Sequence, residues 1–116
     1  MSETDRRVIQ VVFYHTGAHN QPVLEWLREL TPADRKIVGA DLRTVELGWP
    51  VGMPVCRLMG KGLYEVRSNI KDGIARVLFC IHNGKMVLLH GFVKKSQKTS
   101  DDDLNLARKR KRETEK

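Results

Sequence analysis

Residues 63–92 read LYEVRSNIKDGIARVLFCIHNGKMVLLHGF and decide the fold class of this chain. Asn83-Gly84 within it is a strong signal for a tight hairpin turn. The runs on either side of that turn, and a similar run at 56–59, are rich in β-branched and large apolar residues, which is typical of short strands. The pattern predicts a largely antiparallel meander, with strands at 56–59, 63–67, 74–81 and 86–92.

The residues before this meander predict a strand and two helices. A strand is expected at 7–14, where RVIQVVFY is rich in β-branched residues. Pro22 can occupy the first turn of a helix, and apolar residues recur at near-helical spacing from there to Leu47. Thr31-Pro32 is a second start signal, an N-cap followed by proline, so two consecutive helices are expected. Residues 48–54, GWPVGMP, are expected to form a loop.

The C-terminal residues 100–116 are predicted to form a basic helix or tail. Ser100 is a suitable N-cap, and the three aspartates after it favour the positive end of a helix dipole. Few apolar residues follow, so a short amphipathic helix that frays into disorder is expected. The predicted fold class is α+β, in which an N-terminal strand and a helical hairpin pack on a mostly antiparallel sheet and a short C-terminal helix follows.

The chain has 116 residues and a formal net charge of +7. Its length favours a single domain spanning 1–116, and its charge suggests a nucleic acid, an acidic membrane surface or an acidic protein as partner. No stretch is apolar enough for a membrane span or a signal peptide, so a cytoplasmic location is expected. Cys56 and Cys80 lie in apolar strand contexts, which favours buried free thiols. The spacing of the histidines matches no zinc motif, and we expect neither a metal nor a cofactor.

Alternation along the strands gathers charged residues on one face of the predicted sheet. Glu65 and Arg67 share a face of their strand, and Arg76 lies opposite a wholly apolar set that suits the helix-covered side. If the strands pair in sequence order, these three residues meet on the uncovered face, where His90 could join them. Solvated ion pairs are the simpler interpretation, as are lysines that protect a strand edge. In the last strand, one face is expected to carry Met86, Leu88, His90 and Phe92. Lys94 would point to the same face if the strand continues that far.

Four blocks of the sequence resemble the RelE/HigB superfamily of bacterial type II toxins, most closely its HigB-like, phage-derived branch. They are V-x-x-W-L-x-x-L at 23–30, LYEVR at 63–67, RVLF at 76–79 and LLHGFVKKSQKT at 88–99. The resemblance covers nearly the whole chain and implies a compact, microbial ribonuclease-like fold. It also implies the toxin of a toxin–antitoxin system, an endoribonuclease that inhibits translation by cleaving mRNA in the ribosomal A site.

The same resemblance implies a chemistry and a set of partners. Such enzymes use no metal, because the 2′-hydroxyl of the RNA attacks the adjacent phosphorus and leaves a 2′,3′-cyclic phosphate. The reaction needs a base, cations for the transition state and an acid for the leaving oxygen. The implied partners are mRNA on the ribosome and a helix-turn-helix, HigA-like antitoxin, with operator DNA bound only through the antitoxin and no membrane. The alternative is a non-catalytic RNA- or ribosome-binding module on the same fold, a decayed toxin or a regulator.

Position within the motifs assigns roles to individual residues. The resemblance implies that Arg76 stabilises the transition state and that Arg67 contacts phosphate or holds Glu65. Lys94 and Lys95 correspond to the basic pair after the last strand, one of which would stabilise charge or assist the leaving group. Strand parity favours Lys94 for that role.

Glu65 departs from the RelE pattern, which has lysines on this strand and a C-terminal tyrosine that stacks on the base. Glu65 is therefore a candidate general base, or it only orients an arginine, and the sequence leaves both roles open. No tyrosine follows Tyr64, so base stacking would fall to His90 or Phe92. Lys98 is expected to contact RNA.

Overall fold

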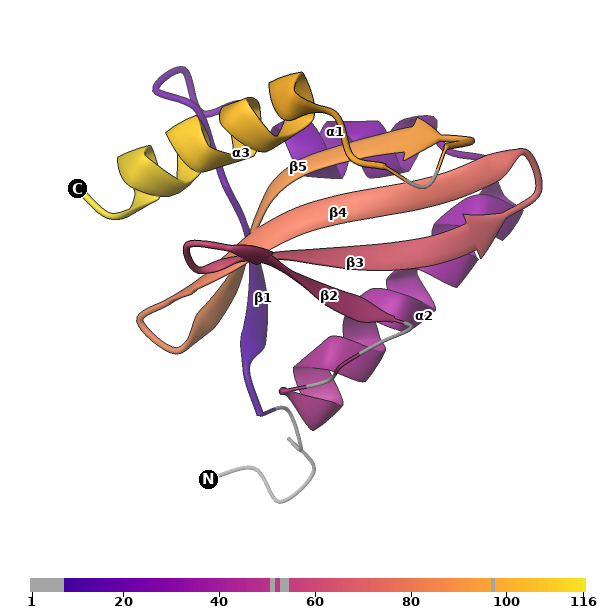
Figure 1. Ribbon diagram of the computed structural model, residues 1–116, viewed down its shortest axis with the longest axis horizontal. Helices are drawn as coiled ribbons and strands as arrows, with labels where there is room; N and C mark the ends of the chain where they lie inside the picture. The colour runs from indigo at the N-terminus through magenta and orange to yellow at the C-terminus, as the bar shows by residue number, and fades with distance from the viewer. Residues whose placement is uncertain (1–7, 51, 53–54, 97) are drawn as a thin grey trace.

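The computed structural model describes residues 8–50, 52, 55–96 and 98–116. Arg7 of the predicted first strand, residues 51, 53 and 54 of the predicted loop, and Gln97 lie outside this description. The elements, shown in Figure 1, are β1 (Gln10–Phe13), α1 (Pro22–Glu29), α2 (Pro32–Gly48), β2 (Cys56–Gly60), β3 (Leu63–Ile70), β4 (Gly73–His82), β5 (Lys85–Lys94) and α3 (Asp101–Thr114).

Within the described residues, five strands form one sheet in the order β1-β5-β4-β3-β2. The strands β2 to β5 form the predicted antiparallel meander. Asn83 and Gly84 connect β4 to β5 with φ values of 52° and 72°, the left-handed conformation that this type of hairpin turn requires. β1 pairs in parallel with β5, with Gln10 opposite Lys85. The α+β class with a mostly antiparallel sheet is therefore confirmed.

The helices α1 and α2 form the predicted hairpin and cover one face of the sheet (Figure 1). The Thr31 hydroxyl accepts a hydrogen bond from the Asp34 backbone N–H at 3.2 Å and so caps α2 where the sequence predicts its start. The core on this side combines buried residues of the hairpin and of the sheet, including Val23, Leu27, Val38, Leu42, Val45, Val66, Val77, Phe79 and Leu88.

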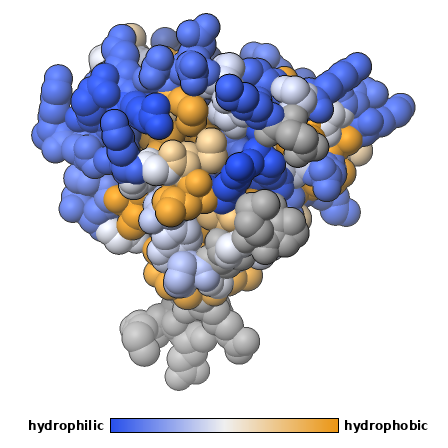
Figure 2. Space-filling model, viewed as in Figure 1, coloured by the Kyte–Doolittle hydropathy of each residue, from blue (hydrophilic) through white to orange (hydrophobic). Residues whose placement is uncertain are grey.

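The prediction that the other sheet face is uncovered and that the C-terminal helix frays is wrong. α3 has 14 residues and lies across that face (Figure 1), where Ala107 is fully buried. Arg110 donates a hydrogen bond to the Leu89 carbonyl at 2.8 Å and stacks on the ring of Tyr14, whose hydroxyl donates to Glu113 at 2.8 Å. Figure 2 shows hydrophilic side chains over α3 at the upper left, with apolar atoms of the sheet visible below them. Polar contacts, more than a wide apolar stripe, therefore hold this helix.

A β-bulge in β5 changes which of its residues share a face. His90 pairs with Leu78 of β4, and Leu88 pairs with the next residue, Phe79, so Leu89 is the extra residue. Leu88 consequently packs on the α1–α2 side, whereas Leu89 packs on the α3 side. His90, two strand positions before Phe92, follows Leu89 onto the α3 side. The prediction that Leu88 and Met86 share a face with His90 and Phe92 is wrong, because the sequence alternation does not include the bulge.

Gly91 lies just after the bulge, where α1 packs closely on β5. A Cβ atom at this position would lie 2.7 and 2.9 Å from two atoms of the Trp26 ring and closer still to a third. Replacing Gly91 by alanine is expected to lower the free energy of unfolding by about 1–3 kcal/mol through overpacking, measured by urea denaturation. Gly39→Ala is the control, because that helical glycine has open space around it and the exchange should stabilise by roughly 0.5–1 kcal/mol. Equal urea midpoints for Gly91→Ala and the wild type would contradict the close approach.

Candidate active site

Glu65 and Arg76 form a buried ion pair between β3 and β4 on the α3 side of the sheet. Both side chains are fully buried. The Arg76 Nη1 atom lies 3.6 Å from Glu65 Oε1, and Arg67 Nε donates to the same carboxylate oxygen at 2.7 Å. Arg67 is directly opposite Arg76 in the register of the two strands. One carboxylate thus holds two guanidinium groups side by side.

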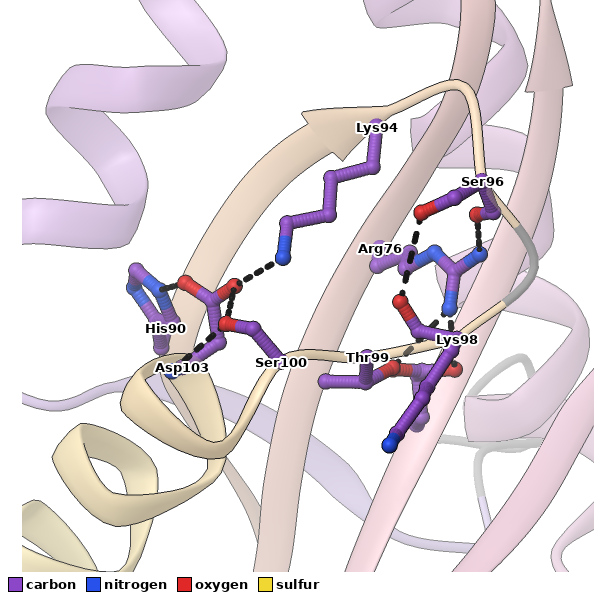
Figure 3. A network of polar contacts seen from close by, with 9 residues as sticks. Arg76, His90, Lys94, Ser96, Lys98, Thr99, Ser100 and Asp103 are labelled. Carbon is purple, nitrogen blue, oxygen red and sulfur yellow. Dashed lines mark hydrogen bonds and ion pairs between the residues drawn. The ribbon is translucent and has the colours of Figure 1, made fainter.

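The connection between β5 and α3 closes over this ion pair. Thr99 is 4% exposed, and its hydroxyl donates to Glu65 Oε2 at 2.5 Å while it accepts from Arg76 Nη1 at 2.9 Å. The Ser96 carbonyl accepts a hydrogen bond from Arg76 Nη2. Figure 3 shows the guanidinium of Arg76 between Ser96 and Thr99. Arg76, the arginine expected to stabilise the transition state, is therefore directed at protein groups in this conformation.

The electrostatics of Arg76 reflect this enclosure. Burial lowers the pKa of its guanidinium, the carboxylate of Glu65 opposes that effect, and the neighbouring Arg67 and Arg57 lower the pKa further. The Nε atom of Arg76 is buried and has no hydrogen-bond partner among the described residues. A buried N–H without an acceptor is costly, so an acceptor oxygen beside it would stabilise the site.

Asp103 forms a second polar cluster, at the first turn of α3. Its carboxylate accepts from Ser100 Oγ at 2.6 Å, contacts His90 Nε2 at 2.7 Å and lies 3.0 Å from Lys94 Nζ. Figure 3 shows Asp103 between these groups. Burial alone would raise the pKa of Asp103, but the hydrogen bonds with Ser100, His90 and Lys94 outweigh it and hold the pKa at about 2. Asp103 is consequently an anion throughout the physiological pH range.

An aromatic surface lies beside this cluster. The rings of His90 and Phe92 stack with centroids 5.0 Å apart, and Lys94 Nζ lies 5.6 Å from the centre of the Phe92 ring. The side chain of His90 is 16% exposed and that of Lys94 is 30% exposed. Solvent therefore reaches these residues, whereas it does not reach Glu65 and Arg76.

The structure separates the predicted site residues into two groups. It brings one set onto the α3 side of neighbouring strands: Glu65, Arg67, Arg76, His90, Phe92 and Lys94. Lys95 and Lys98 are exposed, and the side-chain contacts found for the described residues place neither ammonium group in either cluster. After the bulge at Leu89, β5 continues past Phe92 to Lys94, so the lysine favoured by parity is the one that faces the site.

Sequence reasoning missed the groups that close the site, namely Ser96, Thr99 and Asp103. The sequence carries one signal for Asp103, because it follows the N-cap Ser100 by three residues, as an acidic partner in a capping box does. Its backbone N–H indeed donates to Ser100 Oγ at 3.2 Å. Its contacts with His90 and Lys94 are tertiary, so the residues around Asp103 in the sequence do not predict them.

A pocket of about 590 Å³ lies away from both clusters, at the C-terminal end of α3. It is lined by the loop after β1, by the β4–β5 hairpin and by the end of the helix, with Tyr14, His15, His82, Lys85 and Glu113 among its residues. It contains none of the predicted site residues. This pocket and the buried ion pair therefore lie in different places.

Three further features of the described part of the chain are its candidate metal ligands, its thiols and its helix lengths. Within it, no group of histidine, cysteine, aspartate or glutamate side chains could hold a metal ion. The expected buried free thiols are confirmed for Cys56 and Cys80, which belong to clusters on opposite faces of the sheet. Burial raises the pKa of each thiol to about 11, so both are poor nucleophiles at neutral pH. No helix in the described residues is long and apolar enough to cross a membrane.

Comparison with known proteins identifies the family of this fold and site. The model of the family described as phage derived protein Gp49-like (DUF891) matches residues 25–112, well over half of the chain. The chain belongs to that family. The Gp49-like proteins are a phage-derived, RelE/HigB-like toxin family, and a toxin of this kind has in general an antitoxin as partner. No curated protein matches the chain.

Proposed function

We propose that this Gp49-like protein is the toxin of a type II toxin–antitoxin system that cleaves mRNA on the ribosome. The arrangement of Glu65, Arg67 and Arg76 next to His90 and Lys94 on one sheet face carries this proposal. Arginine remains charged and offers a fork of donors to phosphate oxygens. The net charge of +7 suits a polyanionic substrate, whose binding should weaken as salt concentration rises.

In the proposed mechanism the 2′-hydroxyl gives its proton to a base and attacks phosphorus, and the leaving 5′-oxygen takes a proton from an acid. Arg76 and Arg67 stabilise the negative charge that develops on the phosphate oxygens. Lys94 stabilises the same charge or assists the leaving group. Phe92 and the ring of His90 offer a stacking surface for a base.

The contacts of Glu65 favour an orienting role over a role as general base. Its Oε1 accepts a hydrogen bond from Arg67 Nε and lies near Arg76. Its Oε2 accepts a hydrogen bond from the Thr99 hydroxyl, and the side chain is fully buried. A base must reach the hydroxyl that it deprotonates, within about 2.6–3.2 Å. The imidazole of His90 is partly exposed, so a bound RNA can reach it, which the buried carboxylate of Glu65 does not allow. We therefore assign proton transfer to His90 and the orientation of both arginines to Glu65.

Induced expression without antitoxin tests this function. We expect growth arrest and mRNA fragments that end in a 2′,3′-cyclic phosphate, and we expect purified protein to cleave mRNA only when ribosomes are present. Arg67→Ala should reduce cleavage at least about tenfold, since it removes a charged contact to the phosphate. Arg57→Ala is the matched control, because this exposed arginine lies on the neighbouring strand opposite Glu65. Intact transcripts and normal growth with the wild type would rule out the nuclease.

One observation favours the alternative of a non-catalytic RNA- or ribosome-binding protein. Arg76 and Glu65 are enclosed, whereas several basic residues near or on α3 are exposed and accessible to a polyanion, among them Lys95, Lys98, Lys109 and Arg112. That protein would bind ribosomes in a salt-dependent manner without producing new RNA ends. Mapping of RNA ends in the same induction experiment separates the two functions.

A further inference from the structure

We propose that the carboxylate of Asp103 occupies a phosphate subsite of the RNA site, so that the first turn of α3 competes with the substrate. This inference rests on the proposed RNA function. It assigns Asp103 as an internal competitor and not as a catalytic residue. The chain would consequently exist in a masked state, the one that this structure shows, and in an open state that binds RNA.

The subsite has the donors that a phosphate group needs. His90 Nε2, Lys94 Nζ and Ser100 Oγ converge on one carboxylate at distances of 2.7, 3.0 and 2.6 Å. Two of them are potential cations on the same face of β5. Charge-assisted hydrogen bonds of this kind bind carboxylate and phosphate alike. Ser100 belongs to the segment that carries Asp103 and moves with it. When that segment opens, His90 and Lys94 remain on β5 as the donors that a backbone phosphate would contact.

The same segment also encloses Arg76. Ser96 and Thr99, which accept the hydrogen bonds of its guanidinium, lie in the connection that ends at the N-cap Ser100. β5 fixes one end of that connection and the contacts of Asp103 fix the other. If a phosphate displaces Asp103, then Thr99 and Ser96 are held by their own contacts with the buried ion pair, and Arg76 can exchange these protein acceptors for phosphate oxygens. The buried Nε of Arg76, without a partner among the described residues, is a further donor for that phosphate.

The rest of α3 has its own anchors, so opening can stay local. Ala107 is buried, Arg110 contacts the Leu89 carbonyl and Glu113 accepts from Tyr14, all C-terminal to the first turn. Asp101 and Asp102, both exposed, add negative charge to that turn and repel a nucleic acid while it is docked. The movable unit is therefore the acidic first turn of α3 together with Thr99 and Ser100, which precede it.

The test compares Asp103→Asn with Asp102→Asn, an exposed neighbour in the same helical turn. Both variants remove one negative charge, so they raise the net charge equally. The probe is a 2′-O-methyl RNA oligonucleotide, which has phosphates but no attacking hydroxyl, with binding measured by fluorescence anisotropy. Asp103→Asn should bind about tenfold more tightly than the wild type, because a larger fraction of molecules is open, and Asp102→Asn should stay within about twofold. Equal affinities of the two variants would overturn the proposal.

Hydrogen exchange on the wild type gives a second measurement that does not depend on a variant folding. The Leu104 N–H donates to the Ser100 carbonyl at 3.1 Å and reports on the first turn. Bound oligonucleotide should speed its exchange while the amides from Ala107 onward remain protected. Slower exchange at Leu104 would show that RNA binds with the turn docked, and the competitor role would then be excluded.

Cleavable RNA on ribosomes separates this proposal from the proposed function. If Asp103→Asn binds more tightly and neither protein cleaves, the competitor role holds and the nuclease function fails. If the wild type cleaves and Asp103→Asn cleaves more slowly at unchanged affinity, Asp103 instead orients His90, and the competitor role fails. Faster cleavage by Asp103→Asn supports both.

Discussion

Replacing Arg76 by alanine is expected to lower the free energy of unfolding by about 3–5 kcal/mol, because it leaves the buried carboxylate of Glu65 with less compensating charge. The Ser96 carbonyl and the Thr99 hydroxyl also lose a donor, and the missing side chain leaves a cavity. Urea denaturation followed by circular dichroism measures the change. mRNA cleavage per folded molecule should fall by at least about a hundredfold, the range seen when a transition-state donor is removed.

Arg57→Ala controls for the loss of an arginine from this sheet face. Arg57 lies opposite Glu65 on β2 and is exposed, so its removal should change the free energy of unfolding by no more than about 0.5 kcal/mol. A double-mutant cycle of Arg76→Met with Glu65→Leu then measures the coupling of the buried pair directly. If the cycle shows a coupling near zero, or Arg76→Ala unfolds like Arg57→Ala, Arg76 is not the electrostatic partner on which this site depends.

Replacing Glu65 by glutamine is expected to destabilise the protein by about 3 kcal/mol and to reduce cleavage while the shape of its pH dependence remains. The amide keeps the volume of the side chain but leaves Arg67 and Arg76 without their shared anion. The Thr99 hydroxyl also loses a charged acceptor. Disordered arginines stabilise the transition state less well, so kcat/KM falls at every pH while the base that titrates is unchanged.

The pH profile separates the two roles that the sequence leaves open for Glu65. If Glu65 were the general base, Glu65→Gln would lose the acidic limb of the kcat/KM profile along with the rate. Glu29→Gln on α1 is the matched control, because this exposed glutamate has no contact with the site and its exchange should be nearly silent. If Glu65→Gln lost the acidic limb of the kcat/KM profile and Glu29→Gln kept it, Glu65 would be the general base and His90 would not.

Local signals predicted the elements of this fold well. Thr31-Pro32 starts α2, and Asn83-Gly84 makes the β4–β5 turn, because capping and left-handed turn conformations depend on a few adjacent residues. The face of β3 and β4 that carries Glu65, Arg67 and Arg76 followed from simple alternation for the same reason. Each of these predictions depends only on residues that lie close together in the sequence.

The face of β5 was not predictable in this way. Leu88 and Leu89 are both fully buried, on opposite sides of the sheet, so an apolar run gives no sign of the bulge between them. The docking of α3 was also not predicted, because within the described residues only Ala107, Leu104 and a few polar contacts hold this helix on the sheet. The family motifs predicted His90 and Lys94 as site residues. The bulge in β5 and the position of α3 determine which groups these two residues contact.

The sequence by itself determined the α+β class, the meander and the identity of the charged residues on β3 and β4, because these depend on local propensity and on the two-residue period of a strand. Only the tertiary structure decided that the site is closed. Arg76 is enclosed by Ser96 and Thr99, and Asp103 joins His90 to Lys94, through contacts between segments that lie 9 to 34 positions apart. Such contacts form when separate elements pack together, and their energy depends on burial and distance, neither of which a single stretch of sequence contains.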